Sequence, residues 1–122
     1  MVRETILVVS NGDTGSFDDI FRGSGCNVIR SNISTAVRSA RTFVDEFGQG
    51  IPVAIVHGQT PRDASDVARH LKHAYMGMHV IAMSDQVAEP AREGGMEYDV
   101  IVPNRRSDLR NMLETFLGFR EW

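Results

Sequence analysis

Short apolar runs alternate with helix-spaced apolar patterns along this chain, and the alternation leaves few folds open. Apolar runs bounded by turn-forming residues predict buried strands, and each run is followed by a segment with helical periodicity. Parallel strands joined by helical crossovers need helices on both faces of the sheet. The sequence therefore predicts a flavodoxin-like, doubly wound (βα)5 α/β fold, a three-layer sandwich whose five-stranded parallel sheet has the order 2-1-3-4-5. The predicted strands are Thr5–Val9, Cys26–Ser31, Ile51–Val56, His79–Ser84 and Tyr98–Pro103.

Apolar stripes and capping residues locate the helices. The clearest stripe runs from Ile33 to Phe47, with Ser31 or Asn32 as its N-cap and Gly48 after its end. The other predicted helices are one capped by Asp13 or Thr14, one over Ala64–Tyr75, a short one over Val87–Glu93 that Pro90 limits, and a last one capped by Ser107.

The composition predicts one cytoplasmic domain. The chain of 122 residues shows no repeat or linker, so residues 1–122 are expected to form a single domain. A formal net charge of -3 gives no electrostatic reason to bind nucleic acid or an anionic membrane. No apolar run approaches the roughly 20 residues of a membrane span. The single cysteine, Cys26, excludes an intrachain disulfide, which suits a reducing compartment.

The apolar run Ile51–Val56 ends abruptly at His57 and Gly58. Its β-branched residues predict a strand that is buried on both faces at the centre of the sheet. In open parallel sheets, ligands and chemistry gather beyond the carboxyl ends of the strands. His57 therefore stands where a functional side chain is expected.

These landmarks together resemble the receiver domains of two-component response regulators (CheY-like), over essentially the whole chain. The run Ile6–Val9 resembles the first strand of the family, and Pro61 follows the tip of the third strand as the family's loop proline does. Ser84 ends the fourth strand where a Thr or Ser is expected, and Gly95 and Pro103 resemble the glycine before the fifth strand and the proline at its end.

The resemblance also implies which chemistry is missing. In the family, a strand-three aspartate accepts a phosphoryl group beside Mg²⁺, which acidic residues after strand one help to hold. Here Ser10 and Asn11 occupy the positions of the acidic pair, His57 that of the phosphoacceptor and Val102 that of the lysine, while Ser84 keeps the hydroxyl. Without these carboxylates and the lysine, neither Mg²⁺ nor the transferred charge has a stabiliser. We therefore expect no aspartyl phosphorylation, no metal, no cofactor and no catalytic residue.

The signalling surface departs from the family as well. Asp99 occupies the position of the aromatic residue that couples the site to the output surface, and neighbouring Tyr98 is expected to face the opposite side of the strand. The span from Ser84 to Gly95 predicts a fourth helix about one turn shorter than in the family. The resemblance thus implies a non-enzymatic pseudo-receiver that binds a signalling protein or output domain, as a monomer or weak homodimer.

His57 has alternative interpretations. It could be a phosphohistidine, a metal ligand or a pH sensor, since histidine can change its charge near neutral pH. The simpler interpretation is a neutral imidazole that fills the vacated pocket and hydrogen-bonds with Ser10, Asn11 or Ser84. A small-ligand or anion sensor using His57, Asn11 and Ser84 in the same crevice is the alternative function.

Three further groups of side chains have both a functional and an ordinary explanation. Asp66, His70 and His73 have a spacing that can bind zinc, although a solvated helix face is the commoner cause of such a pattern. Arg105 and Arg106 could hold an anion before the last helix, and a solvated charge pair is again commoner. The methionines Met76, Met78 and Met83 could form part of a partner surface, but they are most simply expected to fill the core.

Overall fold

The computed structural model describes residues 5–10, 27–48, 50–58, 60–75, 77–87, 95–103 and 105–117. Its parallel five-stranded sheet has the order β2-β1-β3-β4-β5, so the predicted fold and strand order are confirmed. The strands are β1 (Thr5–Val9), β2 (Asn27–Ser31), β3 (Val53–His57), β4 (His79–Ser84) and β5 (Val100–Pro103). The helices are α2 (Ala36–Phe47), preceded by a 3₁₀ turn over Ile33–Thr35, α3 (Pro61–Ala74) and α4 (Arg106–Leu117).

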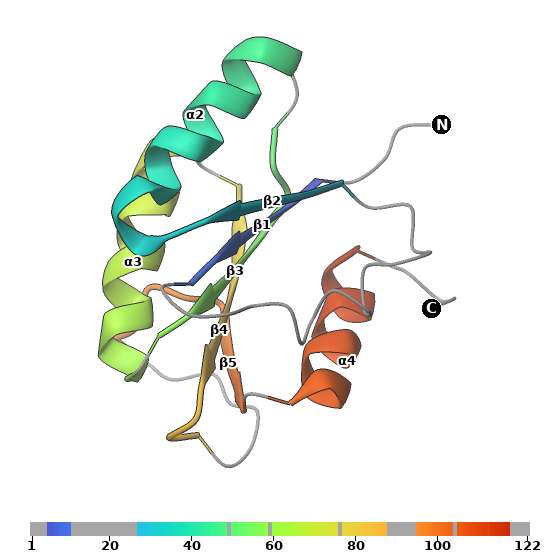
Figure 1. The fold of residues 1–122 in the computed structure, drawn as a ribbon. Helices are drawn as coiled ribbons and strands as arrows, with labels where there is room; N and C mark the ends of the chain where they lie inside the picture. Colours follow the sequence, from blue (N-terminus) through green and yellow to red (C-terminus); the bar gives the residue numbers. More distant parts are fainter. Residues whose placement is uncertain are drawn as a thin grey trace.

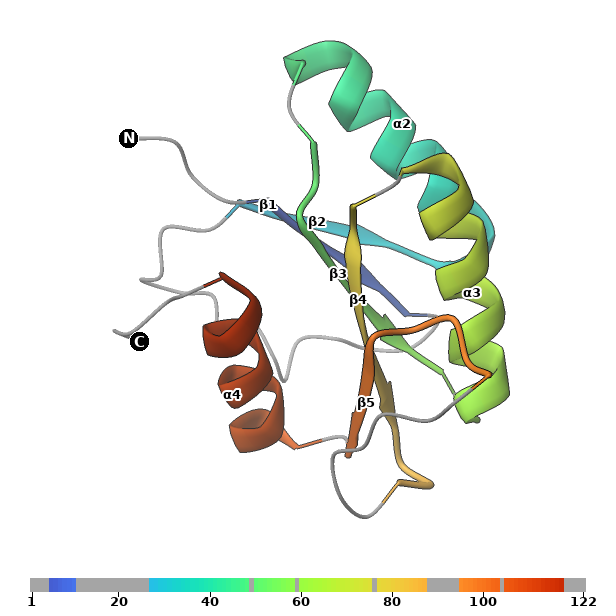
Figure 2. The same ribbon diagram turned by 180° about the vertical axis from the view of Figure 1, so that it is seen from behind.

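The helices form one layer on each side of the sheet. α2 and α3 cover one face, and α4 covers the other (Figures 1 and 2). Within the described ranges, no helix combines the length and the apolar character that crossing a membrane requires.

The core has two parts because side chains alternate between the faces of each strand. The part under α2 and α3 contains Leu7, Val9, Ala54, Val56 and Ile101, and the helices add mainly small residues such as Ala40 and Ala68. The part under α4 contains Ile6, Val8, Val53, Ile55, Ile81, Met83, Val100 and Val102, with Leu109 and Leu113 from the helix. Burial on both faces explains why the strands are apolar without alternation in the sequence.

The predicted caps of the second helical segment are confirmed. The side chain of Asn32 accepts a hydrogen bond from the backbone N–H of Thr35 at 2.9 Å. Gly48 has φ 65°, a left-handed conformation that strains other residues, and its N–H donates to the carbonyl of Val44. Thr60 caps α3 in the same manner through the N–H of Asp63, and Pro61 occupies the first turn.

Several element boundaries differ from the prediction. α4 begins at Arg106, so Ser107 lies inside the first turn and is not the cap that the sequence suggested. Phe47 ends the apolar stripe of α2 but is 62% exposed. The predicted helices near residues 13–22 and 87–93 lie outside the described residues, except for Val87. Met78 and Met83 are buried as predicted, while Met76 is also outside the described residues.

Replacing Ile55 with alanine should test the central strand as the source of stability. Ile55 is 2% exposed, and its removal leaves a cavity in the part of the core under α4. We expect the free energy of unfolding to fall by about 2–5 kcal/mol. Urea denaturation with an unchanged slope measures the difference. The exposed Thr42→Ala on α2 is the control and should stay within about 0.5 kcal/mol of wild type. Equal midpoints for the two variants would contradict the assignment.

Candidate functional site

Four side chains from four strands lie side by side near the carboxyl edge of the sheet. β1 and β3 pair in register up to their ends, so Ser10 and His57 follow as neighbours. His57 is paired with Met83 of β4, and Met83 with Val102 of β5. We call these four side chains, Ser10, His57, Met83 and Val102, the strand-end row.

The strand-end row belongs to the face of the sheet that α4 covers. Met83 and Val102 are fully buried there, packed in one cluster with Leu109 and Leu113. Ser84, which directly follows Met83, is paired with Pro103 of β5. Ser84 is fully buried, and its Oγ accepts a hydrogen bond from the N–H of Gln86 at 3.2 Å. The retained hydroxyl therefore lies one residue beyond the strand-end row.

His57 makes a long hydrogen bond with Ser10. The Oγ of Ser10 lies 3.5 Å from Nδ1 of His57, and the tautomer of the imidazole decides which atom donates. Ser10 is 8% exposed, and His57 is half-buried. The contact agrees with the interpretation of His57 as an imidazole satisfied by a neighbouring hydroxyl. At this length it is a weak bond, and it does not activate the hydroxyl for attack. Asn11, the other expected neighbour, lies outside the described residues.

Val102 makes the far end of the row apolar. Its side chain has no exposed surface and packs under α4. Between it and His57 stands Met83, which sequence reasoning assigned to the core but did not place in the site. The cross-strand register was the missing information. The row thus changes from polar at β1 and β3 to apolar at β4 and β5, and Met83 and Val102 offer no cation to a bound anion.

The tip of β3 is packed tightly against the start of α3. A side chain on Gly58 would bring its Cβ to 2.9 Å from the backbone N of Ala64 and 3.1 Å from the carbonyl of Thr60. Gly58 also donates its N–H to the carbonyl of Met83 at 3.0 Å. Gly58, directly after His57, is therefore held close to the sheet and to the start of α3 by backbone contacts that require glycine.

Two of the other predicted groups make ordinary local contacts where the structure describes their side chains. Among the described residues, no three His, Cys, Asp or Glu side chains are placed to hold a metal ion, so the zinc spacing on α3 has no matching cluster. His70 instead contacts the backbone carbonyl of Asp66 through Nδ1 at 2.8 Å. Arg105 donates from Nε to Asp108 at 2.7 Å, which commits it to an ion pair within the start of α4.

Comparisons with known proteins agree with this architecture. No family model matches the chain, and no curated protein matches it. Among solved structures, it is similar to one described as the crystal structure of a response regulator receiver domain protein from Clostridium thermocellum. The TM-score is 0.60 at 15% sequence identity, and the similarity covers 94% of each chain. The chain has the receiver-domain fold.

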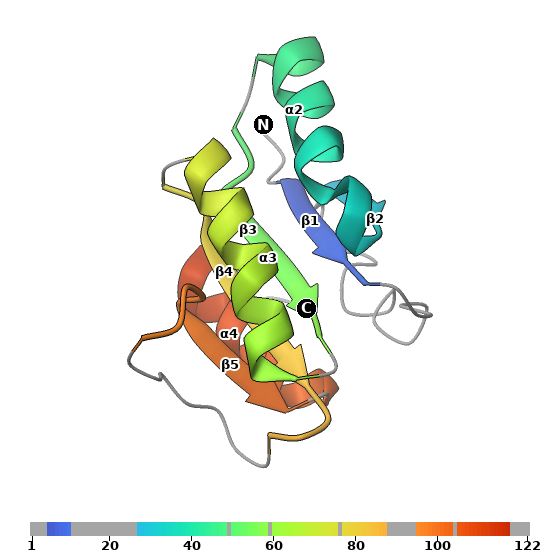
Figure 3. The ribbon, with the colours of Figure 1, turned by 90° about the vertical axis from the view of Figure 1, so that its left-hand side faces the viewer.

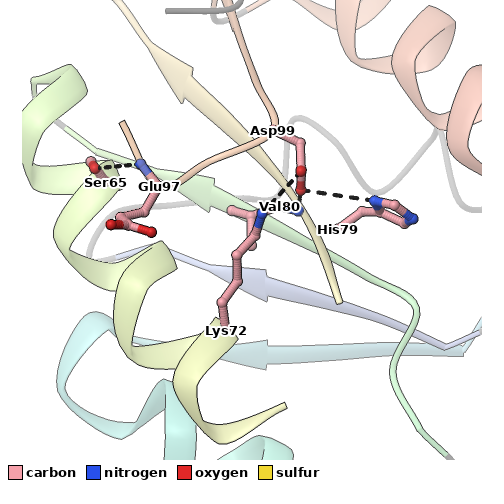
Figure 4. A network of polar contacts seen from close by, with 6 residues as sticks. All are labelled: Ser65, Lys72, His79, Val80, Glu97 and Asp99. Atoms are coloured by element: carbon pink, nitrogen blue, oxygen red, sulfur yellow. Dashed lines mark hydrogen bonds and ion pairs between the residues drawn. The ribbon is translucent and has the colours of Figure 1, made fainter. Parts of the chain in front are cut away.

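Within this receiver fold, Asp99 fastens the entry to β5 (Figure 4). Its carboxylate accepts a hydrogen bond from Nζ of Lys72 on α3 at 2.9 Å and another from the backbone N–H of Val80 at 2.7 Å. Its own N–H donates to the carbonyl of Val80 at 3.0 Å. His79 adds a longer contact, with Nδ1 at 3.9 Å from the carboxylate. Asp99 is thus fixed to both a helix and the neighbouring strand.

The prediction that Tyr98 faces away from Asp99 rests on alternation, which holds along paired strand residues, and pairing of β5 with β4 begins at Val100. It therefore stays a prediction. Tyr98 is 5% exposed and packs into the part of the core under α2 and α3. Just before Tyr98, the N–H of Glu97 donates to Oγ of Ser65 at 2.9 Å, a second attachment to α3.

Substitutions at Asp99 should separate the contribution of its ion pair with Lys72 from that of its hydrogen bond with the backbone N–H of Val80. Asp99→Asn keeps an oxygen for the N–H of Val80 but loses the ion pair, which is partly exposed, so we expect a loss of at most about 1 kcal/mol. Asp99→Ala also leaves that N–H without its acceptor and should cost about 1–3 kcal/mol more. Urea unfolding measures both, and Lys72→Met, which removes the ion pair alone, should resemble Asp99→Asn. Equal effects of Ala and Asn at residue 99 would dismiss the backbone role.

Proposed function

We propose that this chain is an atypical receiver, a pseudo-receiver that acts in signal transduction through protein–protein contact and not through aspartyl phosphorylation. The strand-end row carries this proposal. The tip of the central strand presents an imidazole, and the described residues beside it are a serine, a methionine and a valine. Phosphoryl transfer needs anionic oxygens for a divalent cation and a positive group for the developing charge. Of the described members of the row, none is a carboxylate, lysine or arginine.

The attachment of Asp99 supports the same proposal. In the receivers that this chain resembles, an aromatic residue at this position couples the site to the output surface. Here the position carries a carboxylate that contacts Lys72, Val80 and His79. Any signal that moved the Asp99 side chain to another position would have to break a charge-assisted hydrogen bond. The output surface is therefore expected to keep one conformation.

Adding Mg²⁺ with beryllofluoride or a small phosphodonor tests the proposal directly. Backbone amide NMR shifts should show no saturable change at residues 10, 57 and 84, because no ligand set is available for the cation. A receiver domain that retains the aspartate, measured in the same buffer, is the positive control. Saturable shifts around these three residues would overturn the proposal.

The alternative function, a sensor of a small ligand or anion at the strand-end crevice, draws on the Ser10–His57 contact. Its weakness is that Ser84 is fully buried and lies one residue beyond the strand-end row, while Asn11 lies outside the described residues. Phosphorylation on His57 would use Nε2, since Nδ1 contacts Ser10.

A thermal-shift screen separates the pseudo-receiver from the sensor. A ligand that binds the folded state raises the melting temperature as its concentration exceeds its dissociation constant. We expect inorganic phosphate, sulfate and common metabolites to leave the melting temperature of the wild type and of His57→Ala equally unchanged. A rise that His57→Ala abolishes would favour the sensor. Mass spectrometry at basic pH after incubation with a histidine kinase tests modification of His57, which we expect to remain unmodified.

A further inference from the structure

We draw no further inference here: the strongest candidate, the apolar pocket of about 530 Å³ that Val44, Ile51, Tyr75 and Met78 help to line between the C-terminal ends of α2 and α3 (Figure 3), carries none, because nothing in the described part of the structure shows what covers it.

Discussion

Burial of the central strands on both faces is the constraint on which the rest of this structure depends. Side chains from Ile6 to Val9 and from Val53 to Val56 are at most 4% exposed, so neither β1 nor β3 has a solvent face. A one-residue slip between such strands would exchange the two parts of the core, where α2 and α3 supply alanines with Val67 and Leu71, and α4 supplies Leu109 and Leu113. The register is therefore firmly set, and polar side chains emerge only where the strands stop, which is where Ser10 and His57 meet.

Much of this fold could be predicted from the sequence because its signals are local. An apolar run such as Thr5–Val9 and a cap such as Asn32 or Gly48 act within a few residues, and both were identified correctly. The entry to β5 could not be predicted in the same way. Asp99 is fixed by Lys72, which is 27 residues away, and by the backbone of Val80 on the neighbouring strand. Sequence patterns carry no record of such distant contacts.

The candidate site shows the same division. That His57 ends the central strand follows from the apolar run before it, and that Ser10 lies nearby follows from the strand order. The residues that lie on the same face of the sheet as His57, however, depend on the register between the strands. The pairing of His57 with Met83, and of Met83 with Val102, places two apolar side chains in the same row as the imidazole, one residue before Ser84 and Pro103. The sequence of one strand shows which of its side chains share a face, but only the pairing between strands shows which residues form the strand-end row.

Helix α3 contacts three regions of the structure. Its first turn packs on Gly58 beside His57, Ser65 and Lys72 along its length hold the segment before β5, and its last residue, Ala74, lines the pocket at the far end. A helix of 14 residues spans about 21 Å and moves as one body. A shift at the tip of β3 would therefore have to break the contacts of Asp99 before it reached the pocket. A pseudo-receiver that works by contact, as proposed, would gain from this arrangement, because the far surface would keep one form when the surroundings of His57 change.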